Sequence, residues 1–264
     1  MNKKYILFDL DGTLTDTAEG ITKSVQYALE AQGIKEENLD SPLVVHKKDD
    51  ASYQEANTEV SMQNTHDDLT CYIGPPLDES FQKFHGMTKE QAWEAVEKYR
   101  ERYKDTGIYE TSVIDGMIFV LETLKAAGKT LALATCKPEP FALKILEHFN
   151  LSKYFTVACG SNLDGTRKYK NEIIEEVFAR LNRLEGNGEL TEAVLDEMKA
   201  DSIMVGDRKD DIYGAHNADI EAVGVRFGYA ADGELEEAGA DYIVNTVFEL
   251  TALLLMDDDS VLCD

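Results

Sequence analysis

Two carboxylates stand two residues apart where an apolar run ends. Asp9 and Asp11 follow the apolar residues 5–8 and precede Gly12, which permits a tight turn at the end of a strand. Because side chains alternate along an extended strand, the two acids would share one face if the strand continued through them. Two acids beside a glycine turn at a strand's end indicate a site for a metal ion and a phosphate group.

The residues after this turn predict a helix. Asp16 or Thr17 can cap its first turn, and an apolar stripe at helical spacing follows. Gly33 can end the helix. A strand, a turn and a helix would therefore hold Asp9 and Asp11 in place.

Further polar groups follow apolar runs farther along the chain. Thr135 ends one run, and Lys168 and Lys170 follow the next. Asp207 ends a third run, with Asp211 four residues later. Each run has the composition of a buried strand, and ligands of doubly wound sheets bind beyond the carboxyl ends of strands, where the strand order reverses. We therefore expect these groups at one ligand-binding edge.

Clustered carboxylates at such an edge favour a bound cation. Each carboxylate raises the pKa of its neighbours unless a positive charge lies between them. Oxygen ligands without histidine or cysteine suit a hard ion that keeps water ligands, so magnesium is favoured over zinc.

The rest of the chain predicts an α/β fold. From about residue 111, strand and helix patterns alternate, which predicts a doubly wound, Rossmann-like parallel sheet with helices on both faces. Residues 17–110 show helical patterns and no convincing strand, and Thr88 and Gln91 form a capping box. The expected boundaries are residues 1–16 and 111–256 for the core, 17–110 for an inserted, mainly helical cap, about 41–68 for an extra polar insertion, and 257–264 for an acidic tail.

Individual core elements can also be predicted. Residues 185–198 look like an acidic insertion that is exposed to solvent, and a second capping box opens a final helix at Thr246. The expected strands after the first are residues 130–135, 155–160, 202–207, 222–227 and 242–244.

Four segments carry a family resemblance. DLDGTLTD at residues 9–16 resembles the nucleophile signature of the haloacid-dehalogenase (HAD) superfamily of hydrolases, and GDRKDD at 206–211 resembles its GDxxxD acidic motif. Residues 162–171 resemble the segment that carries its phosphate-binding lysine. IGPPL at 73–77 resembles a cap turn of the phosphoglycolate-phosphatase branch, which has 5′-nucleotidase-like members. The resemblance implies a magnesium-dependent phosphatase.

The resemblance also implies the roles of the acids. Asp9 would attack phosphorus and form an aspartyl-phosphate, and Asp11 would act as general acid and then general base. Magnesium would bind the side chains of Asp9 and Asp207 and the backbone carbonyl of Asp11. Asp211 would bind the ion through water or orient Lys170.

A second group of residues is implied to bind phosphate. Lys170 aligns with the superfamily's lysine, and Lys168 is the alternative. Thr135 would supply its hydroxyl, and Gly12 and Cys136 would lie against the phosphate, with the amide of Cys136 at a helix start. The superfamily implies that Thr135 and Lys170 belong to the catalytic set.

Composition excludes several functions. Lys and Arg number 26 against 51 Asp and Glu, a net charge of −25, which argues against nucleic acid and anionic membranes. No apolar segment is long enough to span a membrane, and no signal peptide is evident. We expect a cytoplasmic protein, monomeric or weakly dimeric, that acts on a small phosphorylated metabolite. Because no CxxC pair occurs, thiols are expected at Cys71, Cys136, Cys159 and Cys263.

Two other functions remain open. A sugar phosphomutase of the β-phosphoglucomutase type would share the nucleophile and the cap position. A non-catalytic, acidic interaction protein could use the same fold, although the complete set of acids speaks against it. Asp219 departs from the pattern, because relatives usually carry glycine near this helix end, where left-handed geometry is expected.

Overall fold

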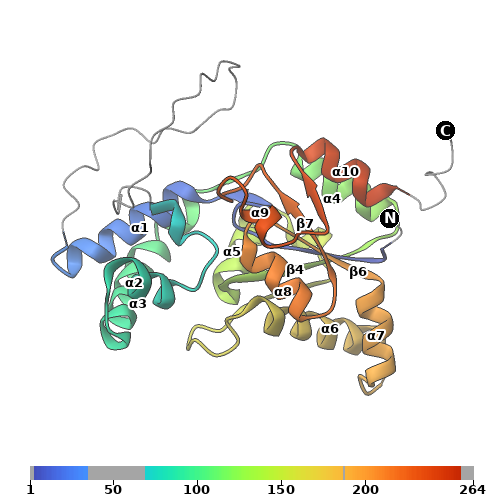
Figure 1. Ribbon diagram of the computed structural model, residues 1–264, viewed down its shortest axis with the longest axis horizontal. Helices are drawn as coiled ribbons and strands as arrows, with labels where there is room; N and C mark the ends of the chain where they lie inside the picture. Colours follow the sequence, from blue (N-terminus) through green and yellow to red (C-terminus); the bar gives the residue numbers. More distant parts are fainter. Residues whose placement is uncertain (1–2, 35–68, 187, 257–264) are drawn as a thin grey trace, which may run out of the picture.

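The computed structural model describes residues 3–34, 69–186 and 188–256. Within these residues, six parallel strands form a central sheet in the order β5-β4-β1-β6-β7-β8 (Figure 1). The predicted polar insertion at about 41–68 and the tail at 257–264 lie outside the described residues. The strands are β1 (Tyr5–Phe8), β4 (Thr130–Pro138), β5 (Val157–Ser161), β6 (Ser202–Gly206), β7 (Glu221–Val225) and β8 (Tyr242–Val244).

The predicted doubly wound sheet is confirmed. β1 lies between β4 and β6, with Phe8 in register with Leu133 on one side and Val205 on the other. The chain builds outward from β1 to β5, then returns to the opposite side of β1 and builds outward to β8. The strand order therefore reverses at β1, so the residues that follow β1 and β6 meet at one edge.

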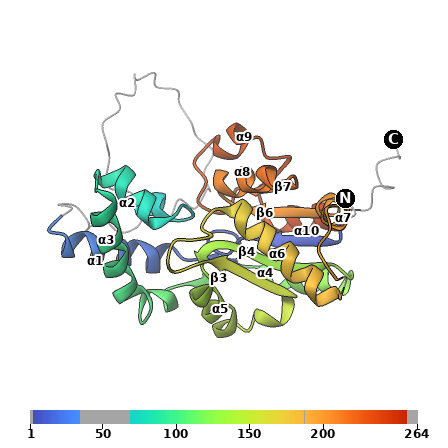
Figure 2. The same ribbon diagram turned by 90° about the horizontal axis from the view of Figure 1, so that it is seen from below.

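Helices cover both faces of the sheet, because successive side chains of each strand point to opposite sides. In β1, Ile6 and Phe8 enter one buried cluster, whereas Tyr5 and Leu7 enter the other. Figure 2 shows the two helical layers from below. The first face carries α4 (Met117–Ala126), α5 (Glu139–His148), η3 (Ser152–Tyr154) and α10 (Val247–Leu255); the second carries α6 (Lys170–Glu185), α7 (Glu192–Ala200), α8 (Lys209–Asn217) and α9 (Glu234–Glu237).

Most of the described residues in 185–198 are exposed to solvent, as predicted, but the stretch also contains a helix that the sequence analysis missed. Residues 192–200 form helix α7, and Thr191 caps its start by accepting a hydrogen bond from Val194 N. Met198 is buried in the second hydrophobic cluster, against which Val194 and Leu195 also pack. This small apolar stripe is masked in the sequence by the many acids around it.

A helical layer, which we call the cap, lies beside the sheet at the left of Figure 1. It begins and ends at a short antiparallel pair formed by β2 (Thr15–Asp16) and β3 (Ser112–Val113). As predicted, the described residues between 17 and 110 contain helices and no strand. Its elements are α1 (Ala18–Ala31), η1 (Leu69–Tyr72), α2 (Leu77–His85), α3 (Lys89–Tyr103) and η2 (Gly107–Tyr109).

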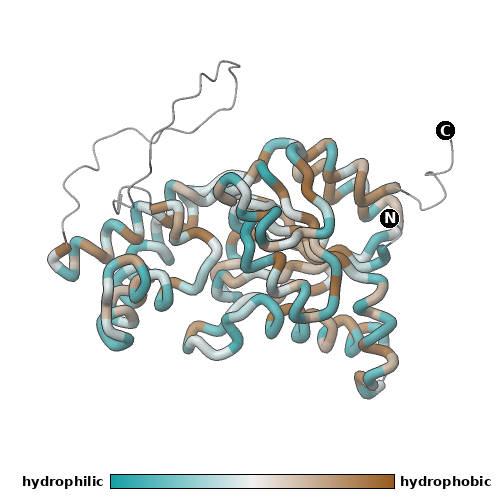
Figure 3. Tube along the Cα trace, in the orientation of Figure 1, coloured by the Kyte–Doolittle hydropathy of each residue, from teal (hydrophilic) through white to brown (hydrophobic). Residues whose placement is uncertain are grey.

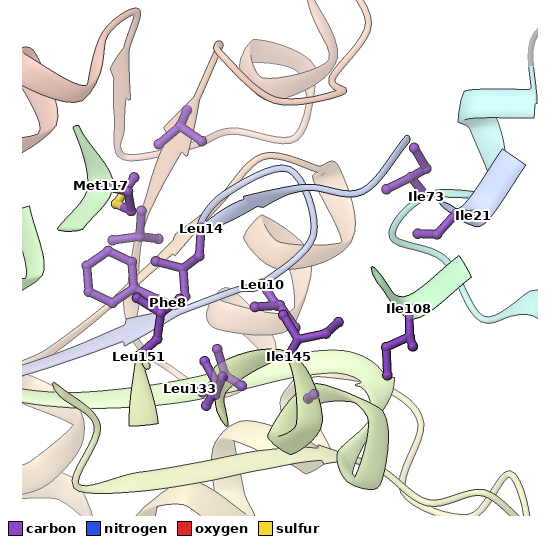
Figure 4. Close-up of a cluster of buried hydrophobic side chains, with 14 of the residues drawn as sticks. Phe8, Leu10, Leu14, Ile21, Ile73, Ile108, Met117, Leu133, Ile145 and Leu151 are labelled. Atoms are coloured by element: carbon purple, nitrogen blue, oxygen red, sulfur yellow. The ribbon is translucent and has the colours of Figure 1, made fainter. Parts of the chain in front are cut away.

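The cap and the sheet share one hydrophobic cluster. Ile21, Ile73 and Ile108 of the cap belong to the same buried cluster as Phe8 and Leu10 at the end of β1 (Figure 4). Hydrophobic and hydrophilic residues alternate along α1 and α3 (Figure 3), as expected of helices that bury one face. This shared burial holds the cap against the ligand-binding edge.

Asp219 adopts the left-handed conformation predicted for it. Its φ is 58°, just past the end of α8, where a residue other than glycine carries a conformational cost. Asp219 Oδ2 accepts a hydrogen bond from Lys199 Nζ at 3.0 Å, which joins the ends of α7 and α8.

The capping box at the start of α3 gives a stability prediction. The Thr88 hydroxyl accepts a hydrogen bond from Gln91 N, and Gln91 Oε1 accepts one from Thr88 N. We expect Thr88→Ala to lower the free energy of unfolding by about 1 kcal/mol, because one N-terminal amide of the helix loses its partner. Urea denaturation checks this value, and Thr156→Ala, at an exposed position before β5, shows the effect of removing a threonine hydroxyl outside a helix cap. An unchanged midpoint for Thr88→Ala would contradict the prediction.

Candidate active site

Three carboxylates meet where β1 and β6 end. Asp9 follows β1, Asp207 follows β6, and Asp211 lies in the first turn of α8. All three are buried, and each offers a ligating oxygen within 4.8 Å of the others. The sequence predicted this convergence, and its physical cause is the parallel pairing of β1 with β6.

Lys170 joins this cluster from the start of α6. Its Nζ lies 2.6 Å from Asp9 Oδ1 and 2.6 Å from Asp211 Oδ1, and it donates a hydrogen bond to the carbonyl of Ala134 at 2.9 Å. Gly214 makes this approach possible, because a Cβ there would lie 2.2 Å from Lys170 Cβ. A close crossing of α6 and α8 thus delivers the ammonium group to the carboxylates.

The alternative lysine lies elsewhere. Lys168 Nζ is 3.0 Å from Asp78 Oδ2 and 2.7 Å from Glu79 Oε1, both at the start of α2 in the cap. Between the two candidates, only Lys170 contacts Asp9. Lys168 instead ties the cap to the segment that precedes α6.

The electrostatics of the cluster leave negative charge without compensation. Burial, together with the charges of Asp211 and Asp9, raises the pKa of Asp207 well above its usual range. Burial also raises the pKa of Asp211 to about 6, although Lys170 acts in the opposite direction. Burial opposes the charge on Lys170, but Asp211 and Asp9 outweigh it and raise the pKa of Lys170. One ammonium among three buried carboxylates leaves room for a cation.

The carboxylate of Asp207 is held on both oxygens. Tyr229 N donates a hydrogen bond to Oδ2 at 2.7 Å, and the Thr13 hydroxyl donates one to Oδ1 at 3.3 Å. Gly12, with a φ of 87°, lies directly against Asp207, because a Cβ there would be 2.2 Å from Oδ2. Of the residues that contact Asp207, the sequence analysis placed only Gly12 in the site, where it was expected to bind phosphate. Thr13 and Tyr229 were missed.

Asp11 lies apart from this cluster and pairs with a different lysine. Its Oδ2 is 2.7 Å from Lys137 Nζ, and its Oδ1 is buried without a hydrogen-bond partner among the described residues, as is the nearby Thr17 hydroxyl. Burial raises the pKa of Asp11, whereas Lys137 opposes that shift. The sequence analysis did not include the side chain of Lys137 in the site.

The segment after Thr135 differs from the prediction. We expected a helix to begin near Cys136, but β4 continues to Pro138 and α5 begins at Glu139. β4 extends beyond Thr135 because it continues to pair with β5, where Pro138 is in register with Ser161. The buried Thr135 hydroxyl accepts a hydrogen bond from Lys137 N at 3.2 Å.

Among the described residues, Cys71, Cys136 and Cys159 form no disulfide, as predicted, and Cys263 lies outside those residues. Burial raises the pKa of Cys136 to about 12, so its sulfur stays protonated and is a poor nucleophile.

A cavity of about 90 Å³ lies between the cap and the sheet. Asp11 and Lys137 form part of its wall on the core side, and Lys168 also borders it. On the cap side, aromatic rings and the proline turn enclose it. The cap residues Tyr72, Pro75, Pro76, Trp93, Tyr99 and Tyr103 line the cavity.

Comparison with known proteins identifies the family. The family model described as haloacid dehalogenase-like hydrolase matches residues 6–43 and 50–225. The chain belongs to the haloacid dehalogenase-like hydrolase family. This membership confirms the resemblance drawn from the four sequence segments.

Several known proteins are similar to the chain along most of its length. A 5′-nucleotidase of Pseudomonas aeruginosa is 39% identical over 87% of this chain and 86% of its own length. The tyrosine-protein kinase PtkA of Mycobacterium tuberculosis is 31% identical over 95% and 72%. A phosphoglycolate phosphatase of Agrobacterium fabrum is 27% identical over 94% and 91%. A crystal structure of a predicted phosphatase from Clostridium acetobutylicum superposes with a TM-score of 0.78 at 37% identity, covering 97% of this chain and 99% of that one.

The HAD-like fold carries no candidate membrane span in the part that the structure describes. None of its helices combines the length and the apolar character that crossing a bilayer requires. The sequence-based expectation of no span therefore holds for residues 3–34, 69–186 and 188–256.

Proposed function

We propose that this HAD-like hydrolase is a magnesium-dependent phosphatase that cleaves a small phosphomonoester. One observation carries the proposal: Asp9, which would be the nucleophile, contacts Lys170 and faces Asp207 and Asp211, while Asp11 borders an adjacent cavity. The names of the similar 5′-nucleotidase and phosphoglycolate phosphatase support the same reaction class.

The donor set of the carboxylate cluster fits magnesium. Among the described residues, three carboxylates converge there, and Lys170 pairs with two of them, Asp9 and Asp211. The side chains of Asp9 and Asp207 would hold the ion, with the backbone carbonyl of Asp11 as predicted and Asp211 through water. A bound magnesium ion would neutralise charge on the phosphoryl oxygens.

Asp9 and the residues around it would carry out the phosphoryl transfer. A carboxylate oxygen of Asp9 attacks phosphorus in line with the leaving oxygen and forms an aspartyl-phosphate. Lys170 balances the charge of Asp9 and the transferring phosphoryl group, and the Thr135 hydroxyl and the amides near Gly12 and Cys136 contact phosphoryl oxygens. Water then hydrolyses the aspartyl-phosphate.

Asp11 would transfer protons in both steps. It protonates the leaving alkoxide in the first step and deprotonates the attacking water in the second, help that typically contributes about 10²- to 10⁴-fold. Because Asp11 borders the cavity beneath the cap, the leaving group would lie in that cavity. Its volume of about 90 Å³ and its aromatic walls favour a small metabolite over a polymer.

A phosphate-release screen tests this function. The panel contains phosphoglycolate, nucleoside 5′-monophosphates, pyrophosphate and hexose phosphates, each assayed with magnesium and with a chelator. We expect free phosphate from at least one monoester, loss of release on chelation, and recovery when magnesium is restored. Magnesium should also raise the thermal midpoint, because it binds only the folded cluster.

Two results of the screen would overturn the proposal. Conversion of a hexose phosphate to its isomer without free phosphate would establish a phosphomutase. No turnover of any compound with magnesium present would favour a non-catalytic interaction protein.

A further inference from the structure

We propose that Lys137 is a positioning residue that holds Asp11 in its catalytic orientation and links it to the cap. The inference rests on the phosphatase function proposed above. The superfamily motifs identified in the sequence did not include the side chain of Lys137. Its contacts, however, join the two groups on which proton transfer to the leaving group would depend.

The first contact is with Asp11. The Lys137 side chain is only 4% exposed, and its Nζ lies 2.7 Å from Asp11 Oδ2. Among the described residues, Asp11 is the carboxylate with which Lys137 forms an ion pair. Because a buried charge is costly without a partner, each of the two side chains restricts where the other can lie.

The second contact is with the cap. Lys137 Nζ lies 4.7 Å from the centre of the Tyr103 ring, which comes from the last turn of α3. Tyr103 is itself fixed, because it is buried and stacks on Tyr99 with ring centres 5.1 Å apart. An ammonium group over an aromatic face is attracted to it, more so when both are desolvated. Lys137 therefore lies between a carboxylate of the core and a ring of the cap.

These contacts restrict the orientation of the Asp11 carboxyl group. Lys137 Nζ pairs with Oδ2, while Oδ1 is buried without a hydrogen-bond partner among the described residues. As Asp9 bonds to phosphorus and the bond from phosphorus to the leaving oxygen breaks, a proton on the Asp11 carboxyl group passes to that oxygen. The Lys137 side chain lies beside the carboxylate that this transfer leaves behind.

A leaving-group comparison separates positioning from a general structural role. Lys137→Met and Lys137→Arg are assayed on 4-nitrophenyl phosphate, whose phenolate leaves readily without a proton, and on an alkyl phosphate, whose alkoxide needs one. The measured quantity is kcat/KM, which reports on the first phosphoryl transfer. We expect Lys137→Met to lower kcat/KM by about 10²-fold on the alkyl ester, which is the typical scale of general acid catalysis. The loss of kcat/KM on the nitrophenyl ester should be far smaller. Lys137→Arg should recover part of the loss, because it keeps the charge.

Companion variants make the result specific. Lys125→Met, at an exposed position in α4, controls for the loss of a lysine and should leave both reactions unchanged. Asp11→Asn combined with Lys137→Met should be no slower on the alkyl ester than Asp11→Asn alone, because the two residues act as one unit. Tyr103→Leu should reproduce the selective loss in weaker form.

Equal losses on both esters, or losses that add to those of Asp11→Asn, would overturn the role of Lys137. Circular dichroism and the thermal midpoint identify variants that fail to fold. If Lys137→Met does not fold, the ratio of kcat/KM on the alkyl ester to kcat/KM on the nitrophenyl ester is measured for Lys137→Arg and Tyr103→Leu instead. Failure of the wild-type chain to release phosphate from either ester would instead count against the proposed function.

Discussion

Replacing Asp9 by asparagine is expected to abolish phosphate release while the protein stays folded. The amide cannot attack phosphorus, so kcat should fall by at least about 10⁴-fold, in line with the loss of a covalent nucleophile in other enzymes. The change is nearly isosteric and removes one of three clustered negative charges, so the folded cluster should not become less stable. Initial rates of phosphate release and circular dichroism of the purified variant check both parts.

Asp210→Asn is the matched control for Asp9→Asn. Asp210 lies next to Asp211 at the start of α8 but does not belong to the carboxylate cluster. The control should therefore keep nearly all activity. Substantial turnover by Asp9→Asn with the same substrate and a linear dependence on enzyme concentration would rule out an aspartyl-phosphate at this position.

The second large effect is expected for Lys170→Met. Lys170 is buried, and its ammonium contacts both Asp9 and Asp211. Its removal takes away charge stabilisation in the transition state, which in comparable sites is worth about 10²- to 10³-fold in kcat. It also leaves the carboxylates without their lysine, which should lower the free energy of unfolding by about 3 kcal/mol in the absence of metal.

The two lysines of this segment can be compared directly. Lys168→Met should change kcat much less, because Lys168 pairs with Asp78 and Glu79 in the cap and does not contact Asp9. Magnesium should restore part of the stability lost in Lys170→Met, because a bound cation reduces the repulsion among the clustered carboxylates. If Lys168→Met is the more damaging variant for kcat, the assignment of Lys170 as the phosphate lysine is wrong.

Tyr229 contacts the chain where it enters the cap. The Tyr229 hydroxyl donates to Asp16 Oδ1 at 2.6 Å and accepts from the backbone amide of Thr17 at 2.9 Å. The backbone amide of the same tyrosine holds Asp207. One residue therefore connects the start of α1 to the carboxylate cluster, which fixes the cap entry relative to the site.

Much of the fold followed from local patterns in the sequence. Apolar runs bounded by turns marked the strands, and helical stripes with caps such as Thr88 and Thr246 marked the helices. Their ends shifted by a few residues, most of all in β4, because pairing with β5 extends that strand beyond its apolar run. Helix α7 was missed because its packing against the sheet depends on only a few apolar residues.

The acids of the candidate site were also recognisable, because short motifs combine a strand end, a turn and a helix start whose geometry is local. The sequence by itself determined the α/β alternation, the family and the positions of Asp9, Asp11 and Asp207. The tertiary structure alone decided that Lys170 rather than Lys168 reaches Asp9, and that Lys137 pairs with Asp11. Those contacts join residues more than a hundred positions apart, and only the strand order and the packing of helices against the sheet bring such side chains together.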